Sequence, residues 1–293
     1  MKPKVTIGIC ARNSAAIIKH AIESVIAQDF PHDQLEIIFV DDGSTDDTLR
    51  IAQRMIAKSD VLANFFPIPW SGIGKARNIV LNNAAGEYVL WVDSDEILEK
   101  DFVRKQFNLM EQNPKAGIGV ARLGFSHDDN LVLALDLVPN IIEYAYVNFN
   151  SSAKLPGTGG AIYRVSAARE VGGFDESVDT LGEDIDIAKR IKDRGWLIVN
   201  GTAVFYEKHG GLGSWSVLWR RYVSRGAYSR KLLLKNRQLF SLYKINPIAS
   251  FILSLMYVVQ GYKITKSKKM LLLPIHFTLK MIAWFYGFNK ASF

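Results

Sequence analysis

Two pairs of acidic residues have types and a spacing that suit the binding of a cation and the removal of a proton. Asp93 and Asp95 stand one residue apart, directly after a short apolar run. Alternate side chains of an extended chain point to the same side, so both carboxylates can face one hard cation, and their oxygens suit Mg²⁺ or Mn²⁺. A cation held there could also bind a diphosphate and offset the charge of a departing group. The alternative is an acidic turn that is simply exposed to solvent.

The second pair, Glu183 and Asp184, opens a predicted helix over residues 183–194. A carboxylate in a fixed position can act as a general base and take the proton from an attacking hydroxyl group. Negative charge in the first turn also stabilises a helix, by less than about 1 kcal/mol. The pair is therefore either a catalytic feature or a feature that stabilises the helix.

The first third of the chain alternates between predicted strands and helices. Short apolar runs rich in β-branched residues predict strands, and apolar residues at helical spacing predict helices. This alternation predicts an α/β fold with a doubly wound, mostly parallel sheet and flanking helices, whose ligands lie beyond the carboxyl ends of the strands. Polar clusters at 11–13, 41–44 and 93–96 follow strands, so we expect them to meet in one crevice. The predicted strands are 5–10, 36–40, 65–70 and 87–92, and the predicted helices are 15–28, 45–58 (capped by Ser44 or Thr45) and 74–85.

Farther along the chain the pattern is less regular. Residues 117–165 contain several strand-like runs, and the glycine-rich patch at 157–160 would let the backbone approach a ligand. Another strand is expected over 197–206. The composition then changes, which predicts a catalytic domain over 1–213 and a helical tail over 214–293.

The composition indicates a folded protein with a basic tail. The 293 residues are 48% hydrophobic and 22% charged, which excludes intrinsic disorder. The one cysteine, Cys10, cannot form a disulfide within the chain and lies in an apolar run, so a buried thiol is expected. The net charge is +7, but residues 208–293 hold 15 Lys and Arg and no Asp or Glu, whereas residues 1–207 hold 21 basic and 29 acidic residues. A basic and apolar tail favours anionic lipid over nucleic acid as the partner.

The tail has the composition of a segment that lies on a membrane. Residues 214–240 interleave Arg and Lys with Trp, Leu and Tyr, as interfacial helices do. Residues 246–262 are 17 uncharged residues, and residues 270–289 are 20 residues interrupted by Pro274 and Lys280. A membrane-spanning hairpin would carry the intervening lysines to the far side, so helices in the membrane plane or re-entrant helices are favoured. A helix pair that belongs to the folded core is the alternative.

Six motifs in register resemble family 2 glycosyltransferases of the GT-A fold, over about residues 4–210. They are VTIGICARN, IIFVDDGSTDDT, GIGKARN, GEYVLWVDSDE, GGFDE and GEDIDIAKRIKDRGW. The resemblance implies a domain that binds a nucleotide sugar, a single displacement that inverts the anomeric centre, and a divalent cation, Mn²⁺ or Mg²⁺.

The resemblance also implies roles for residues on the nucleotide side. Asp42 would contact the base, with Asp41 as the alternative, because an Asp can accept a hydrogen from several bases. A turn-forming Asp is the structural alternative. Lys75 and Arg77 would lie near the nucleotide and the diphosphate, at the beginning of a helix where anions are favoured. The residues expected against the nucleoside are Cys10, Ala11 and Arg12.

For the cation, the resemblance implies that Asp95 is a ligand. Asp93 would face either the cation or the ribose, and Ser94 between them would belong to the nucleotide site. His209 could complete the metal shell, since imidazole beside two carboxylates suits Mn²⁺. A loop histidine without a ligand is the alternative.

For the reaction, the resemblance implies that Asp184 is the base that deprotonates the acceptor hydroxyl. Inversion requires in-line attack, so this carboxylate must lie on the face of the sugar opposite the leaving nucleotide. Glu183 would position the sugar hydroxyls.

These expectations combine into a non-processive glycosyltransferase at the cytoplasmic face of a membrane. The N-terminus lacks a secretory signal pattern, and the QxxRW motif of processive synthases is absent from the sequence. The expected donor is a nucleotide diphosphate sugar, UDP in preference to GDP, and the expected acceptor is a lipid-linked or cell-surface glycan. A polyprenyl-phosphate glycosyl synthase and a non-catalytic membrane-bound sensor of glycans or nucleotide sugars are the alternatives.

Overall fold

The chain folds into two units in this computed structural model. The sheet unit comprises Met1–Gly124 and Val147–Lys208, and the helical unit comprises Phe125–Tyr146 and His209–Phe293. The helical unit therefore combines the predicted tail with an earlier segment of the chain. The structure describes residues 2–125, 131–152, 154–177, 182–208, 214–235 and 247–290.

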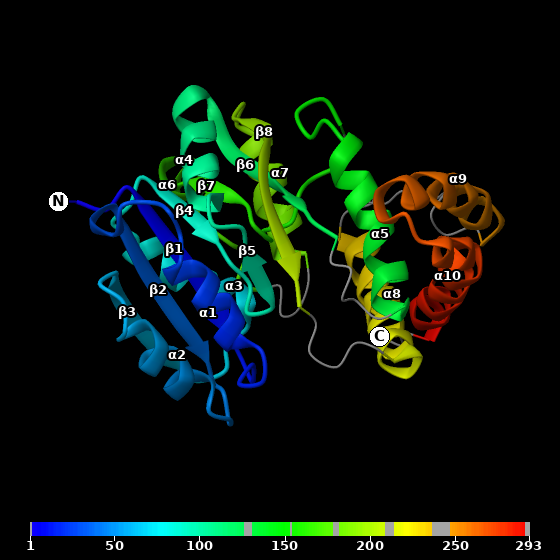
Figure 1. Cartoon of the computed structure of the whole chain (residues 1–293), viewed down its shortest axis with the longest axis horizontal. Helices are drawn as coiled ribbons and strands as arrows, with labels where there is room; N and C mark the ends of the chain where they lie inside the picture. The colour runs from blue at the N-terminus through cyan, green and yellow to red at the C-terminus, as the bar shows by residue number, and fades with distance from the viewer. Residues whose placement is uncertain are drawn as a thin grey trace. The chain divides into compact units, whose positions relative to one another are not determined.

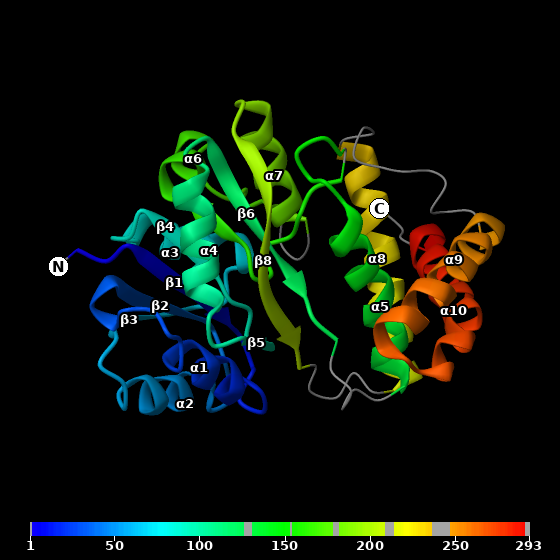
Figure 2. The same cartoon turned by 45° about the horizontal axis from the view of Figure 1, so that its top comes forward.

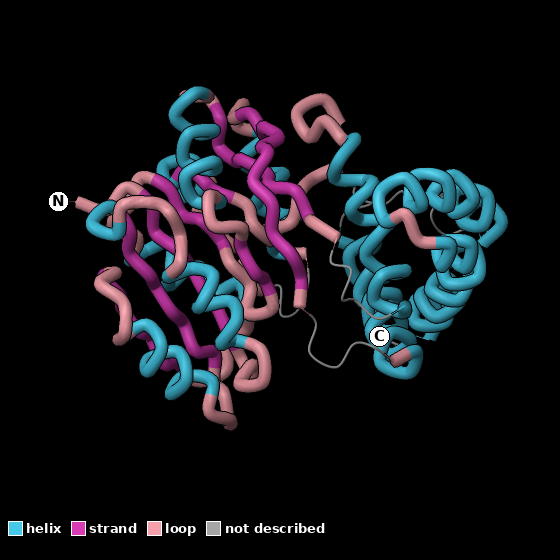
Figure 3. The backbone as a smooth tube through the Cα atoms, viewed as in Figure 1, coloured by secondary structure: helices cyan, strands magenta, loops and turns pink. Residues whose placement is uncertain are grey.

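A single sheet forms the centre of the sheet unit (Figures 1 and 3). Its strands are β1 (Val5–Ala11), β2 (Leu35–Asp42), β3 (Leu62–Ile68), β4 (Tyr88–Trp91), β5 (Glu96–Leu98), β6 (Ala116–Leu123), β7 (Ile162–Arg164) and β8 (Leu197–Glu207), in the spatial order β3-β2-β1-β4-β7-β6-β8-β5. β1 pairs in parallel with β2 and β4, β2 with β3, and β6 with β8, whereas β7 and β5 are antiparallel to their neighbours. The predicted α/β fold with a mostly parallel sheet is thereby confirmed.

Helices cover both faces of this sheet (Figure 2). They are α1 (Ile18–Ile26), α2 (Thr48–Ile56) and α4 (Phe102–Gln112) on one face, and α3 (Ile73–Asn83), α6 (Val165–Glu170) and α7 (Glu183–Asp193) on the other, with a short 3-10 helix at His32–Gln34. Every residue of β2 is buried, as expected for a strand covered on both faces. α1 buries Ile18, Ile22 and Val25, whose helical spacing creates its apolar face.

α2 begins later than the sequence predicts. Its first residue is Thr48, and Oδ1 of Asp46 accepts the Thr48 N–H at 3.0 Å in place of a cap from Ser44 or Thr45. Thr45 N instead donates to Asn13 Oδ1 at 2.8 Å. The polar residues after β2 therefore hold the loops after β1 and β2 together.

Within the described residues, the helical unit contains four long helices. They are α5 (Leu131–Tyr146), α8 (Trp215–Lys235), α9 (Pro247–Thr265) and α10 (Leu273–Lys290), with a 3-10 helix at Lys268–Leu272 before α10. Several strand-like runs are expected within residues 117–165, but Leu131–Tyr146 form a helix, because a short apolar run can form either a strand or a buried helix and packing decides between them. Leu135 and Val138 of α5 pack with Tyr257 of α9 and Leu273 of α10.

Two glycines allow α8 and α10 to approach closely. A Cβ atom at Gly226 would lie 1.9 Å from the carbonyl oxygen of Trp284, and one at Gly287 would lie 1.9 Å from that of Val223. Both distances are far shorter than a van der Waals contact, so larger residues at these two positions would push the helices apart.

A buried polar cluster joins three helices of this unit. Asp136 of α5 is 3% exposed, and its Oδ1 accepts the Tyr222 hydroxyl of α8 at 2.8 Å and lies 2.6 Å from Lys280 Nζ of α10. His276 of α10 is also buried, with Nε2 3.6 Å from the same oxygen. The lysine that interrupts the last apolar stretch of the sequence therefore has a buried acidic partner, supplied by α5.

One helix in the described ranges, Lys268–Lys290, has the length and apolarity needed to cross a membrane. Core helices of soluble proteins share these two properties, so this is weak evidence. About a quarter of its most apolar window, 28%, is buried within the protein.

Candidate active site

The carboxyl ends of β1, β2 and β4 bring three of the predicted polar clusters together. Ala11 lies beside Asp41 in the register of β1 and β2, and Gly8 lies beside Trp91 in that of β1 and β4. The hydroxyl groups of Ser14 and Ser94 are 3.0 Å apart and link the loop after β1 to the loop after β4. The predicted convergence at one edge of the sheet is therefore present.

A cavity of about 220 Å³ opens at this edge. Its floor contains the residues expected against the nucleoside, and its wall contains Trp70, a residue that the sequence analysis did not single out. Trp70 is 60% exposed, and the guanidinium carbon of Arg12 lies 4.9 Å from the centre of its ring. The lining residues are Cys10, Ala11, Arg12, Asp42, Trp70, Gly72 and Ile73.

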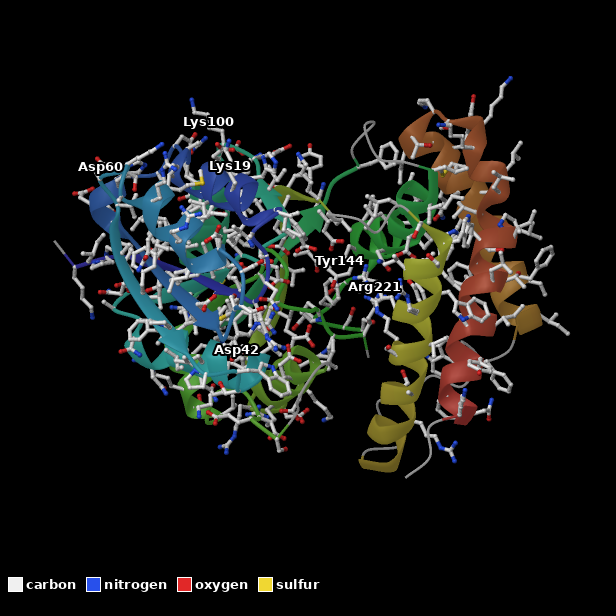
Figure 4. The ribbon with its side chains drawn as sticks, turned by 90° about the horizontal axis from the view of Figure 1, so that it is seen from below. Lys19, Asp42, Asp60, Lys100, Tyr144 and Arg221 are labelled. Atoms are coloured by element: carbon white, nitrogen blue, oxygen red, sulfur yellow. The ribbon has the colours of Figure 1, made fainter. Side chains whose placement is uncertain are left out.

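The two aspartates at the end of β2 have different environments. Asp42, labelled in Figure 4, accepts the backbone N–H groups of Ser71 at 2.7 Å and Gly72 at 3.1 Å, so it shapes the loop before α3. Asp41 accepts the Ser44 N–H at 3.3 Å through Oδ2, while its buried Oδ1 has no hydrogen-bond partner within the described residues. Asp42 lines the cavity, and Asp41 does not.

Glycine is required in the turn after these aspartates. Gly43 has φ of +72°, and a Cβ atom there would lie 2.5 Å from the Trp70 backbone nitrogen. The turn therefore comes close enough to the Trp70 segment to fix one wall of the cavity.

Cys10 is half-buried at the end of β1. Burial is the main cause that raises the pKa of its thiol, to about 12, and Arg77 partly opposes the shift. The thiol is therefore neutral at physiological pH, which makes it a lining group and not a nucleophile.

Arg77 lies at the centre of the site and joins the two acidic pairs. Its guanidinium is buried, donates to Glu183 Oε1 through NH1, and donates to Asp93 Oδ1 through NH2 at 3.3 Å. Its carbon lies 6.0 Å from the Trp91 ring and 5.7 Å from the Phe174 ring. Burial alone would lower the pKa of Arg77, but Asp93 and Glu183 raise it above its usual value, so the cation is retained.

Glu183 is the first residue of α7, after Gly182, which takes φ of +96°. Its side chain is 6% exposed, and Oε2 has no hydrogen-bond partner among the residues that the structure describes. Burial raises the pKa of Glu183, Arg77 lowers it, and the neighbouring Asp184 raises it again. Asp184 is half-buried, and its Oδ1 accepts the backbone N–H of Ile185 at 2.7 Å.

Asp93 lies among charges that shift its pKa in opposite directions. Desolvation raises the pKa of Asp93, Arg77 lowers it, and Asp95, Asp184 and Glu207 raise it further. Its side chain is 43% exposed, so it remains open to a ligand. Repulsion among these carboxylates means that a cation bound at Asp93 would relieve unfavourable interactions.

The donor set fits a hard cation in part. Asp93 and Asp95 supply carboxylate oxygens, the ligands that Mg²⁺ and Mn²⁺ prefer. In the part of the chain that the structure describes, however, no three His, Cys, Asp or Glu side chains form a group that could hold a metal ion. The residues therefore fit a cation whose shell is completed by another ligand, such as a diphosphate.

One predicted site residue lies apart from this arrangement, and another cannot be placed in it. Lys75 is exposed on α3, although it shares that helix with the buried Arg77. His209 lies outside the described residues. A further residue, Glu96, is buried, and its carboxylate accepts the backbone N–H of Asp93. The sequence analysis included it only in the polar cluster at 93–96. Its position directly after the two aspartates could have indicated a role in the site.

Comparisons with known proteins find glycosyltransferases among the relatives of this chain. The poly(ribitol-phosphate) beta-N-acetylglucosaminyltransferase TarS of Staphylococcus aureus is 36% identical over 101 residues, which are 34% of this chain and 18% of TarS. The probable glycosyltransferase YdaM of Bacillus subtilis is 26% identical over 244 residues, which are 80% of this chain and 57% of YdaM. The chain thus spans less than two thirds of the length of these relatives.

Solved structures show the same fold. The mannosyltransferase PcManGT from Pyrobaculum calidifontis, in complex with GDP-Man and Mn²⁺, has a TM-score of 0.73 and 18% identity, covering 100% of this chain and 89% of its own. TarS 1–349 in complex with UDP-GlcNAc has a TM-score of 0.53 and 19% identity, covering 98% and 91%. Residues 6–172, more than half of the chain, match the family described as glycosyl transferase family 2. The chain belongs to this family.

Proposed function

We propose that the protein is an inverting, metal-dependent glycosyltransferase that moves one sugar from a nucleotide diphosphate sugar, UDP in preference to GDP. The acceptor is a lipid-linked or cell-surface glycan, and the enzyme works at the cytoplasmic face of a membrane. The observation that carries the proposal is the double ion pair of Arg77. Its guanidinium contacts Asp93, on the proposed donor side, and Glu183, on the proposed acceptor side.

On the donor side, the cavity at the ends of β1 and β2 holds the nucleoside. Trp70 offers an aromatic face to the base, and Asp42 offers oxygens for its N–H groups, with Asp41 as the alternative. Asp93 and Asp95 would hold Mn²⁺ or Mg²⁺, and the ion would supply positive charge to offset that of the departing diphosphate. Arg77 opposes the rise in the pKa of Asp93 that burial causes, and it contacts Asp93 Oδ1 at 3.3 Å.

On the acceptor side, Asp184 takes the proton from the attacking hydroxyl. A general base is effective when it is held within hydrogen-bond reach of the proton, and the first turn of α7 holds Asp184 next to Glu183. Glu183 orients the sugar hydroxyls through Oε2, which has no other partner within the described residues. Attack from the side opposite the leaving nucleotide inverts the anomeric centre.

Membrane attachment rests on the surface of the helical unit. One side of α9 exposes large apolar side chains, including Ile252, Met256 and Val259, each about 60% exposed, and α10 exposes Ile275 to the same extent. Monomeric soluble proteins rarely expose contiguous apolar surfaces of this kind. α8 adds basic side chains, of which Arg221 is labelled in Figure 4. An exposed apolar surface on a unit that also carries basic side chains suits an anionic bilayer.

The activity is tested by incubating the full-length protein in detergent with a panel of UDP- and GDP-sugars. Release of nucleotide diphosphate is measured with Mn²⁺, with Mg²⁺ and with a chelator. We expect one UDP-sugar to be cleaved and the chelator to abolish the reaction. Absence of cleavage for every donor, at concentrations where UDP binds, would favour a non-catalytic sensor instead.

The acceptor is tested by adding lipid-linked glycans and polyprenyl phosphate separately to the reaction with the active donor. We expect transfer to a sugar hydroxyl, because Asp184 supplies the base that a hydroxyl needs and an ionised phosphate does not. Transfer to polyprenyl phosphate alone would contradict the proposed acceptor while leaving the donor chemistry intact.

A further inference from the structure

Glu96 connects two loops of the site without lining the cavity. It is 2% exposed, and one of its oxygens, Oε2, accepts the backbone N–H of Asp93 at 3.1 Å and that of Gly160 at 3.2 Å. The first of these groups belongs to the turn that carries Asp93 and Asp95. The second belongs to the glycine-rich segment at 157–160. A single buried carboxylate therefore holds the two loops together by hydrogen bonds to both.

Gly160 is a firm anchor for this connection. Its carbonyl accepts a hydrogen bond from Nε2 of the fully buried Gln106 at 2.7 Å, so both of its backbone groups are held by buried side chains. It takes φ of +59°, and a Cβ atom there would lie 2.6 Å from the Phe205 ring. The next residue is tied to β4, because Trp91 N donates to Ala161 O at 3.0 Å. Glu96 thus fastens the acidic turn to a part of the structure that cannot easily move.

The second oxygen of Glu96 is confined by Gly159. A Cβ atom at this glycine would lie 2.6 Å from Glu96 Oε1, which is too close for any real contact. The carboxylate can keep its position because residue 159 has no side chain.

We propose that Glu96 is a positioning residue that holds the backbone of Asp93 in the conformation that binds the cation and the diphosphate. This inference rests on the proposed function, because it assumes that Asp93 and Asp95 bind a cation with the nucleotide. Glu96 acts through the Asp93 N–H group and touches neither ligand. Partners that orient metal ligands in this way commonly contribute about 10- to 100-fold to metal affinity.

A general loss of stability could imitate this effect, and the chain offers a matched control. Glu36 is also 2% exposed and accepts two backbone N–H groups, those of Ala85 at 2.6 Å and Gly86 at 3.3 Å. It lies near the beginning of β2, at the end of the strand opposite the site. Its replacement removes the same kind of buried carboxylate without touching the acidic turn.

The experiment measures UDP binding to the full-length protein by calorimetry, with and without Mn²⁺, and compares the gain in affinity that Mn²⁺ provides. We expect Glu96→Ala to lose at least about 10-fold of this gain, because the Asp93 turn loses its anchor. Glu96→Gln should keep the gain within about 3-fold, since its amide oxygen can accept both N–H groups. Glu36→Ala should also keep the gain within about 3-fold, although it lowers stability as other losses of buried hydrogen bonds do.

The outcomes separate the inference from the proposed function. The positioning role would be overturned if Glu96→Ala kept the whole Mn²⁺-dependent gain in UDP affinity. It would also be overturned if Glu36→Ala or Glu96→Gln lost as much of this gain as Glu96→Ala does. If Glu96→Ala does not fold, Gly159→Ala decides: displacement of the Glu96 carboxylate should reduce the gain, and an undiminished gain would contradict the inference. A wild-type protein whose UDP affinity ignores Mn²⁺ would contradict the metal-dependent function itself.

Discussion

Replacing Arg77 by methionine is expected to leave the buried Glu183 carboxylate without its cationic partner. Arg77 and Glu183 each expose 6% of the side chain, so the ion pair is well shielded from water. Removing one partner of a buried pair leaves an uncompensated charge and costs about 3–5 kcal/mol of unfolding free energy. Methionine preserves most of the volume beside the Trp91 and Phe174 rings, so the cost arises from the charge and not from a cavity.

The loss should depend on pH in a defined direction. Burial already raises the pKa of Glu183, and Arg77 is the group that opposes this shift, so Arg77→Met raises the pKa further. Between the unfolded pKa and the raised folded pKa, the folded state binds more protons than the unfolded state. The free energy of unfolding therefore falls as pH rises through that interval, by about 1.4 kcal/mol for each unit of pKa difference. The variant should be less destabilised at pH 5 than at pH 8.

Urea unfolding of the full-length protein at both pH values, followed by circular dichroism, measures this. Arg164→Met is the matched control: Arg164 is also buried, but the carboxylate it pairs with, Glu87, is 53% exposed, so the loss should not change with pH in the same way. The double variant Arg77→Met/Glu183→Gln should recover most of the stability. A cost below about 1 kcal/mol, or equal costs at pH 5 and pH 8, would refute the buried-pair account of Arg77.

Three further outcomes follow from the structure. Asp184→Asn should retain UDP affinity but lower the rate of sugar transfer by at least about 10²-fold, as loss of a general base does; comparable turnover would remove Asp184 from the mechanism. Asp136→Leu should lower the stability of the helical unit by about 3–5 kcal/mol, because Lys280 keeps a buried charge without a partner. The double variant Asp136→Leu/Lys280→Met should restore most of this stability. A single variant with unchanged thermal unfolding would contradict the ion pair. The full-length protein should float with anionic liposomes and stay bound in high salt. Salt screens the electrostatic contribution, about 1 kcal/mol per basic residue, but it does not screen the burial of apolar side chains. Protein that does not bind liposomes would refute membrane attachment.

The central strands and the edge that carries the site could be predicted from local sequence. β1, β2 and β4 are short apolar runs, each followed by polar residues, and their parallel pairing follows from the helices between them. The polar clusters after β2 and β4 were therefore correctly assigned to one edge of the sheet. These features depend on neighbouring residues in the chain, which is why a single sequence reveals them.

The partners of Arg77 could not be predicted in the same way. Glu183 lies 106 residues away in sequence, and nothing in the GKARN motif distinguishes an arginine that binds a diphosphate from one that neutralises two carboxylates. Trp70 was missed because one exposed aromatic residue in a loop has no pattern. The helical state of 131–146 was missed because its valines, isoleucines and Pro139 disfavour a helix locally, whereas packing against α9 and α10 favours it.

The membership of α5 in the helical unit has a consequence for the order in which the protein is made. Asp136 is synthesised about 140 residues before Lys280, an interval of roughly 7–30 s at ordinary rates of translation. The rest of the sheet unit emerges during this time, so that unit can fold while Leu135 and Val138 still lack the apolar partners they will have in α9 and α10. The nascent chain therefore carries an exposed apolar helix that a chaperone or the membrane must shield. Ending the chain before α8 would make that exposure permanent, so a catalytic fragment must lose 125–146 together with the tail.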